Sequence, residues 1–325
     1  MREQLAYSLQ DLGMTRMALG RIETARTAFE EAASLWERLH NLPMLAENWT
    51  NISYIRIMAG EFDGALAASE ESLRLAKSIG NERGQVNARG FVGLAPIARG
   101  EVDQALALVQ NMIADAERVG HPSHMIGWFY LGWLYTHLGA YARSAEAAER
   151  GLAASVGFPP FRPANLAMAA RERIREGNFA AAEDLLGEAK QLGAGSTLQA
   201  IELLVDMVET ETFLARRDFE RAEEKMAVSL AKARTSGARY FLADALRLQA
   251  ALHRVMGRSD AARESLEEAR EAAEQIEARI VLWQILAELG DNEAAREVID
   301  FIAGNISEKA LRQDFLAHAQ KKLEA

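Results

Sequence analysis

Cysteine is absent from this chain of 325 residues, and proline occurs only six times. Without cysteine the chain forms neither a disulfide framework nor a thiolate metal site, which suits a reducing compartment. The scarcity of proline leaves long windows rich in Ala, Leu, Glu and Arg, which favour helix. Neither a secretion signal nor an uncharged apolar run of about 18 residues appears. We therefore expect an all-α cytoplasmic protein that does not enter a membrane.

Clustered positive charge is also lacking. The chain carries 37 Lys and Arg against 47 Asp and Glu, a formal net charge of −10. Nonspecific binding to nucleic acid needs groups of cations that neutralise phosphates. No long basic run is present, so we expect no direct nucleic-acid partner.

Motifs for catalysis are missing as well. The sequence has no phosphate-binding glycine loop with lysine, no paired-histidine zinc motif and no nucleophile elbow. His121 and His124 are separated by Pro122 and have no third ligand nearby, so we interpret them as surface histidines at a helix start. We predict that the chain is not an enzyme and that it holds no cofactor and no metal.

A glycine turn recurs along the chain at intervals close to 40 residues, shortening only at the last interval. The turn residues are Gly20, Gly60, Gly100, Gly139, Gly177, Arg217, Gly257 and Gly290. Internal repetition at about this period indicates an array of hairpins in which each unit packs on its neighbours. In the first unit, small Gly13 and Ala25 let two helices approach, while Phe29 fills the space beside them.

The fourth unit shows the repeated pattern most fully, with apolar and small residues on one helix, a glycine turn, and aromatic and small residues on the next. Its members are Trp128, Leu131, Gly132, Tyr135, Gly139, Tyr141, Ser144 and Ala148. This set resembles the tetratricopeptide repeat (TPR) consensus, and most other units match it in part. The resemblance implies a right-handed α-solenoid of about eight TPR-like helix hairpins that forms a single superhelix over residues 1–325.

The helix boundaries follow from the turns and the apolar periodicity. The predicted pairs are 2–18 with 22–40, 43–58 with 62–79, 83–98 with 102–119, 122–138 with 142–154, 161–175 with 179–192, 197–216 with 219–235, 239–256 with 259–276, and 278–289 with 292–304. A capping helix is expected near 307–324. Pro96 should kink the helix 83–98 around Val92. The proline-rich residues 155–163 predict either a bend in the array or an ordinary inter-repeat loop.

The resemblance also implies that the first helix of each pair lines a concave groove in which partners bind. The groove candidates for ligand or peptide binding are Tyr7, Tyr54, Phe129, Trp133, Arg171, Arg175, Arg247 and Arg254. Aromatic residues are common anchors at binding hot spots, and arginines select carboxylates or phosphates. Each binding role has a structural alternative that stays open. For Phe129 and Trp133, the alternative is that neighbouring repeats bury them in place of a ligand. For the arginines, it is that Glu211 and Asp244 neutralise their charge.

A second resemblance concerns the biological setting. Residues 72–84, and the ending formed by 302–307 and 311–316, look like the repeat junctions and tail of large bacterial regulators. These regulators are related to the maltose-regulon activator or are cyclase and kinase fusions. The resemblance implies a noncatalytic module that binds a protein or peptide in signalling or transcriptional control. The alternatives are a sensor of a sugar or other small metabolite, and a scaffold or dimerisation module; the oligomeric state stays undetermined.

Overall fold

The computed structural model describes residues 1–193 and 198–324, and within these ranges every regular element is a helix. Eight hairpins follow one another: α1 (Arg2–Ala18) with α2 (Ile22–Arg38), α3 (Leu42–Ala59) with α4 (Phe62–Ser78), α5 (Glu82–Ala88) and α6 (Leu94–Arg99) with α7 (Val102–Arg118), α8 (His124–His137) with α9 (Tyr141–Ala154), α10 (Arg162–Arg175) with α11 (Phe179–Gly193), α12 (Gln199–Ala215) with α13 (Phe219–Ser236), α14 (Leu242–Val255) with α15 (Ser259–Gln275), and α16 (Arg279–Leu289) with α17 (Asn292–Gly304).

The terminal helix α18 (Lys309–Leu323) packs on α16 and α17, close to the predicted range 307–324. The prediction of an all-α solenoid of about eight hairpins is confirmed. Most predicted boundaries agree within two residues. The predicted start of one helix at residue 197 lies outside the described residues.

The first helix of the third hairpin departs from its predicted course. Residues 83–98 were predicted as one kinked helix, but turns at 89–93 separate α5 from α6. Pro96 has no N–H to donate and its ring crowds the preceding turn, so the helix does not run through this point. Gly90 and Gly93 weaken the helix further. The distortion expected around Val92 is therefore a complete break.

The hairpin turns depend on a left-handed backbone residue. Gly60, for example, has a φ of 79° at the C-terminal end of α3. Arg217 occupies the same place in the sixth hairpin and has a φ of 61°, although it is not glycine. The repeat therefore preserves the backbone conformation even where the residue changes.

The hairpins themselves pack through small residues beside large ones. A Cβ added to Gly13 would lie 2.7 Å from the ring of Phe29, so only glycine admits the close approach of α1 to α2. Phe29 is fully buried. This is the arrangement expected from the first unit of the sequence.

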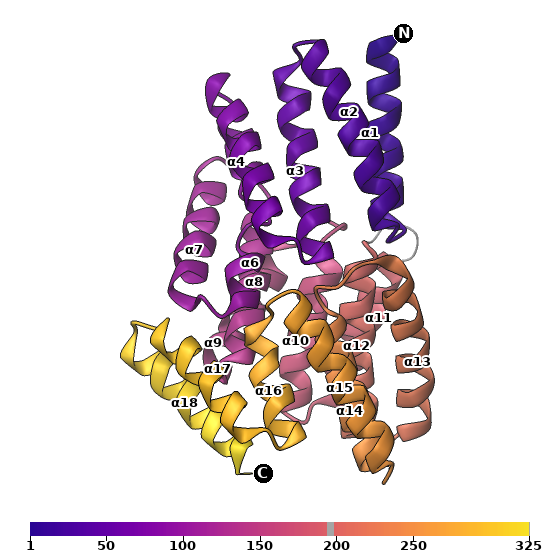
Figure 1. Ribbon diagram of the computed structural model, residues 1–325, viewed down its shortest axis with the longest axis vertical. Coiled ribbons are helices and arrows are strands. Elements are labelled where there is room, and N and C mark those ends of the chain that lie inside the picture. Colours follow the sequence, from indigo (N-terminus) through magenta and orange to yellow (C-terminus); the bar gives the residue numbers. More distant parts are fainter. Residues whose placement is uncertain (194–197, 325) are drawn as a thin grey trace.

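The array then closes on itself, so that its two halves touch (Figure 1). The lower ends of α1 to α3 meet the upper ends of the helices that follow in the C-terminal half. We call these contacts the seam. On its N-terminal side lie the turns at Gly20, Gly60, Gly100 and Gly139. On its C-terminal side lie residues 236–240, 276–279, 302–308 and His318. Across it, the Arg239 N–H donates to the Met58 carbonyl at 2.7 Å.

The proline-rich connection lies between the two halves. Helix α9 ends at Ala154, and α10 begins at Arg162 with Pro163 in its first turn, where a missing N–H costs nothing. The Arg162 side chain donates to Glu188 and to the Leu152 carbonyl. These bonds tie the connection to the hairpins on both sides.

Candidate functional site

A polar pocket of about 230 Å³ lies on the inner surface of the C-terminal half. First helices of hairpins four to eight line it, together with α9 and α18. The lining residues are Trp133, Thr136, His137, Tyr141, Arg171, Ile174, Arg175, Met207, Glu211, Asp244, Arg247, Leu248, Ala251, Gln284, His318 and Lys322. Ligand pockets commonly measure about 300–1,000 Å³, so this pocket suits a small chemical group better than a long peptide.

Half of the predicted groove residues meet in this pocket: Trp133, Arg171, Arg175 and Arg247. Arg254 lies beside it and donates to Glu288, the carboxylate that also accepts from Arg247.

The remaining candidates lie elsewhere. Tyr7 is exposed on α1 with its ring edge against Trp36. Tyr54 is buried against Phe91. Phe129 is buried beside Trp133.

Trp133 is covered from across the seam. Its ring meets Phe241 edge to face at a centroid distance of 5.2 Å, and the side chain is only 2% exposed. Trp133 and Phe129 are therefore buried within the protein, as the alternative of burial by neighbouring repeats predicted. Trp133 still contributes one edge to the pocket wall.

Arg171 is held by a bidentate ion pair. Its guanidinium donates to both oxygens of Glu211, at 2.9 and 2.7 Å, and lies 5.2 Å from the centre of the Trp133 ring. Two parallel N–H to oxygen bonds fix the plane of the arginine. Glu211 thus neutralises Arg171, as the sequence allowed.

The other two arginines of the pocket make different contacts. Arg175 stacks over the Tyr141 ring at 4.4 Å and contacts Glu172 and the Thr136 hydroxyl. Arg247 donates to Glu288 at 3.0 Å, while its buried Nε has no acceptor.

Asp244 and His137 face one another without forming an ion pair. The Asp244 carboxylate lies 3.7 Å from His137 Nε2. Burial raises the pKa of Asp244 to about 6, against the opposing effect of Arg247. Burial, reinforced by Arg247 and Arg171, lowers the pKa of His137 to about 3. At neutral pH the histidine is therefore neutral, and Asp244 gives up its proton less readily than a solvated carboxyl group.

The terminal helix completes the pocket with His318 and Lys322. Burial and the charge of Lys322 lower the pKa of His318 to about 4. Burial and the nearby Arg247 lower the pKa of Lys322. Sequence reasoning missed these two residues and Gln284, because helices far along the chain bring them in and no repeat pattern marks them.

Comparison with known proteins agrees with this architecture. A family model described as Tetratricopeptide repeat matches residues 4–78, and a second model of the same description matches residues 93–157. The chain is a tetratricopeptide repeat protein. No curated protein sequence matches it.

Solved structures show the same kind of array. The crystal structure of a Rap protein complexed with competence and sporulation factor is 12% identical, with a TM-score of 0.64, and the match covers 83% of this chain and 75% of that one. Yeast Tom70 is 16% identical, with a TM-score of 0.44 and coverage of 92% and 60%. A signal transduction ATPase with a tetratricopeptide repeat sensor from Pyrococcus horikoshii is 14% identical, with a TM-score of 0.47 and coverage of 98% and 47%. The first likeness shows a shared fold.

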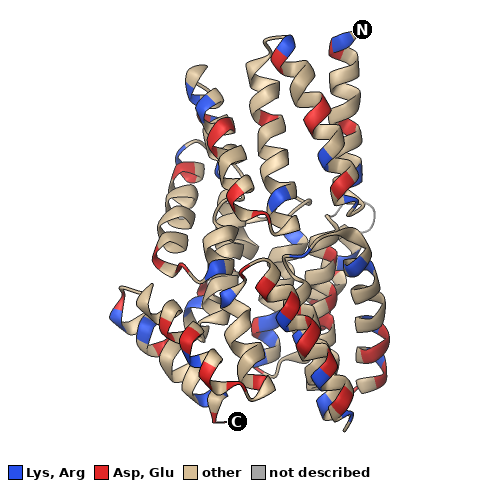
Figure 2. Ribbon diagram, viewed as in Figure 1, with Lys and Arg blue, Asp and Glu red and all other residues tan. Residues whose placement is uncertain are grey.

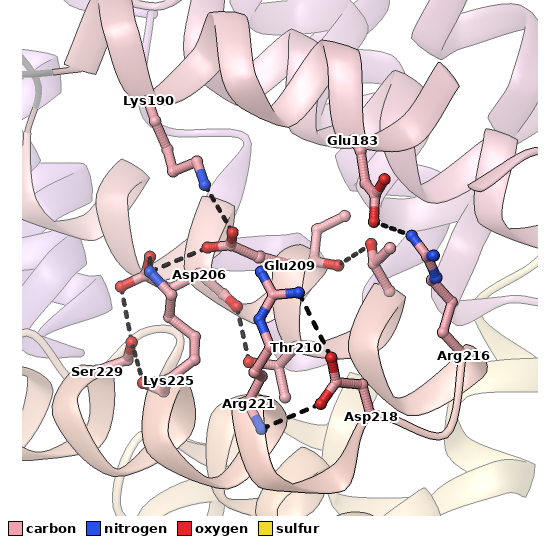
Figure 3. Close-up of polar contacts among 12 residues, drawn as sticks. Glu183, Lys190, Asp206, Glu209, Thr210, Arg216, Asp218, Arg221, Lys225 and Ser229 are labelled. Atoms are coloured by element: carbon pink, nitrogen blue, oxygen red, sulfur yellow. Dashed lines mark hydrogen bonds and ion pairs between the residues drawn. The ribbon is translucent and has the colours of Figure 1, made fainter. Parts of the chain in front are cut away.

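Charge on the rest of this tetratricopeptide repeat protein is mixed in sign. Acidic and basic residues are interspersed over the helices (Figure 2). One cluster links α11, α12 and α13 (Figure 3). Glu209 accepts a hydrogen bond from Lys190 and forms an ion pair with Lys225, which also donates to Asp206. These opposite charges pair with one another, so we interpret the cluster as a brace between hairpins.

In residues 1–193 and 198–324, no three His, Asp or Glu side chains are grouped to hold a metal ion. In the same ranges, no helix combines the length and apolar character needed to cross a bilayer.

Proposed function

We propose that this tetratricopeptide repeat array is a noncatalytic module that binds a polypeptide through its concave surface and holds an anionic group of that partner in the pocket. Tetratricopeptide repeats support a role in protein interaction. The observation that carries the finer proposal is the convergence of Arg171, Arg175 and Arg247 on one cavity. The setting we propose, on the resemblance to large regulators, is bacterial signalling or transcriptional control in the cytoplasm.

The arginines suit an anion because the pocket limits their contact with water. Guanidinium groups recognise carboxylates and phosphates through paired N–H bonds, and such bonds strengthen where water is excluded. The Nε of Arg247 has no acceptor, and the side chain of Lys322 has no ion-pair partner among the described residues. Lys322 is therefore available to an incoming anion, and Arg247 keeps one donor that the protein does not use.

A small anionic metabolite is the second candidate ligand. The pocket volume of about 230 Å³ favours it, because a whole metabolite of modest size fills such a space. Ligand binding there would link α8, α10, α12, α14 and α18, and so bias the curvature of the array. This is the sensor alternative, which we propose for this cavity.

Peptide-array binding tests the proposal. The array carries peptides with acidic side chains and free carboxyl termini, beside amidated and neutral versions. We expect acidic peptides to bind the wild type, and Arg247→Gln to weaken them at least tenfold, while Arg234→Gln leaves binding unchanged. Arg234 is a suitable control because its exposed pair with Glu268 lies outside the pocket. Binding that is indifferent to acidic groups and to Arg247→Gln contradicts the proposal.

Native mass spectrometry separates the two candidate ligands. A copurified polypeptide lost in Arg247→Gln supports the peptide module. A small stoichiometric adduct lost in the same variant supports the metabolite sensor.

A further inference from the structure

Asp244 is the carboxylate in the pocket that accepts no hydrogen bond from any described protein group. It extends from α14 and is 7% exposed. Burying a charge without a partner is costly. Glu211, the other carboxylate of the lining, is paired with Arg171. The exception at Asp244 points to a partner supplied by the ligand.

His137 does not fill that role. The Gln284 side-chain amide lies 3.3 Å from His137 Nδ1, and with the amide N–H donating there, the proton of a neutral imidazole resides on Nε2. At 3.7 Å this Nε2 is too far from Asp244 for a hydrogen bond and is itself without a partner. A donor placed between helices α8 and α14 would satisfy Asp244.

Cationic groups stand beside this unpaired carboxylate. Arg247 lies one helical turn after Asp244 on α14, so both side chains face the same cavity. Lys322 enters from α18. The lining also includes the apolar residues Ile174, Leu248 and Ala251. The pocket thus places a site for negative charge next to one for positive charge.

We infer that the ligand group held in this pocket is zwitterionic, with a primary amine bound by Asp244 and a neighbouring carboxylate bound by Arg247 and Lys322. The inference rests on the proposed function and adds the amine to the anion proposed there. Two sources carry this chemistry: a free α-amino acid, and the amino terminus of a polypeptide whose first residue is acidic. Both place an amine and a carboxylate a few bonds apart, and a cavity of about 230 Å³ accommodates either end group.

Isothermal titration tests the inference on the whole chain. The probes are the common L-amino acids and the tripeptide Glu-Ala-Ala, each with its N-acetylated form, which keeps the carboxylates and removes the positive charge. We expect acetylation to weaken wild-type binding at least tenfold. Asp244→Asn should weaken the free-amine probe by a similar factor and make acetylation nearly without effect. Asp184→Asn, an exposed aspartate outside the pocket, is the matched control.

The variants remain informative because Asp244→Asn removes an unpaired buried charge and should fold at least as well as the wild type.

Tight binding of free amino acids alone assigns the first source, and tight binding of the tripeptide alone assigns the second. If acetylated probes bind as well as free amines, and Arg247→Gln abolishes both, the anion site stands and the amine site is wrong. The inference is overturned if no probe binds, or if neither Asp244→Asn nor Arg247→Gln changes the affinity of any probe. Unchanged affinity in Arg247→Gln also removes the proposed anion site.

Discussion

Arg171 and Glu211 stand 40 residues apart, one repeat period, and their side chains form a bidentate ion pair on adjacent first helices, α10 and α12. The pair lies in the pocket wall with Arg171 largely buried. An exposed counterpart with similar geometry joins Arg234 to Glu268, 34 residues apart. The two pairs differ chiefly in access to water, which allows a direct comparison.

We expect Glu211→Gln to lower the free energy of unfolding by about 1–3 kcal/mol, because it leaves the buried Arg171 without its charged acceptor. Glu268→Gln should cost less than about 1 kcal/mol, since water solvates Arg234. Urea denaturation of both variants measures the difference. Equal losses would show that the Arg171 pair is as well solvated as the surface pair.

The brace between α11 and α13 predicts sensitivity to acid. Burial alone would raise the pKa of Glu209, but hydrogen bonds from Lys190 and Lys225 outweigh it and lower that pKa (Figure 3). A carboxylate with a lowered folded-state pKa stabilises the fold above its unfolded pKa of about 4.3, and this stabilisation is lost as pH falls through the folded-state value.

Glu209→Gln should therefore cost about 1–3 kcal/mol at pH 7, with the difference from wild type shrinking at pH below about 4. Urea midpoints at several pH values measure it. Glu224→Gln, an exposed position on α13, serves as the control and should show no such trend. A loss that stays constant with pH would mean that the charge of Glu209 is not what stabilises the brace.

Glycine should fit the turn of the sixth hairpin better than the native Arg217 does. Arg217 adopts a φ of 61°, which costs a side-chain-bearing residue about 1 kcal/mol. We expect Arg217→Gly to stabilise the chain by a few tenths to about 1 kcal/mol, since glycine relieves this strain but has more freedom to lose on folding. Thermal unfolding checks the sign. A destabilised variant would show that the Arg217 side chain makes a stabilising contact.

Two glycine turns provide a test of the seam. Gly60 and Gly257 have φ values of 79° and 74°. A Cβ at Gly60 would lie 2.1 Å from Cγ2 of Ile276, across the seam, whereas nothing lies within 4 Å of a Cβ at Gly257. Gly257→Ala should cost about 1 kcal/mol of backbone strain, and Gly60→Ala a further 1–3 kcal/mol, roughly, from the clash.

Chemical denaturation compares these two alanine variants. Small-angle scattering reports whether Gly60→Ala also expands the molecule. Equal stability losses without expansion would place the two halves of the array apart in solution.

Local sequence determined the hairpins. The left-handed turn at Gly60 depends on groups within a few residues of it, so propensity and spacing suffice to place it. Pro96 marks a local distortion in the same way, although the sequence predicted a kink around Val92 and the structure has a full break at 89–93. The resemblance to the tetratricopeptide repeat implied that the first helices line an inner groove, which is why Trp133, Arg171, Arg175 and Arg247 were expected together.

Tertiary structure alone decided how the array closes and which inner residues remain accessible. Tyr240 donates to the Leu94 carbonyl 146 residues away, and Ser307 reaches Asp103 across 204 residues. Contacts at such separations leave no periodic mark, because small rotations accumulated over several repeats decide which turns meet. The same closure brings His318 and Lys322 to the pocket. The sequence by itself therefore determined the repeating unit and its inner face, while the superhelical path decided the site.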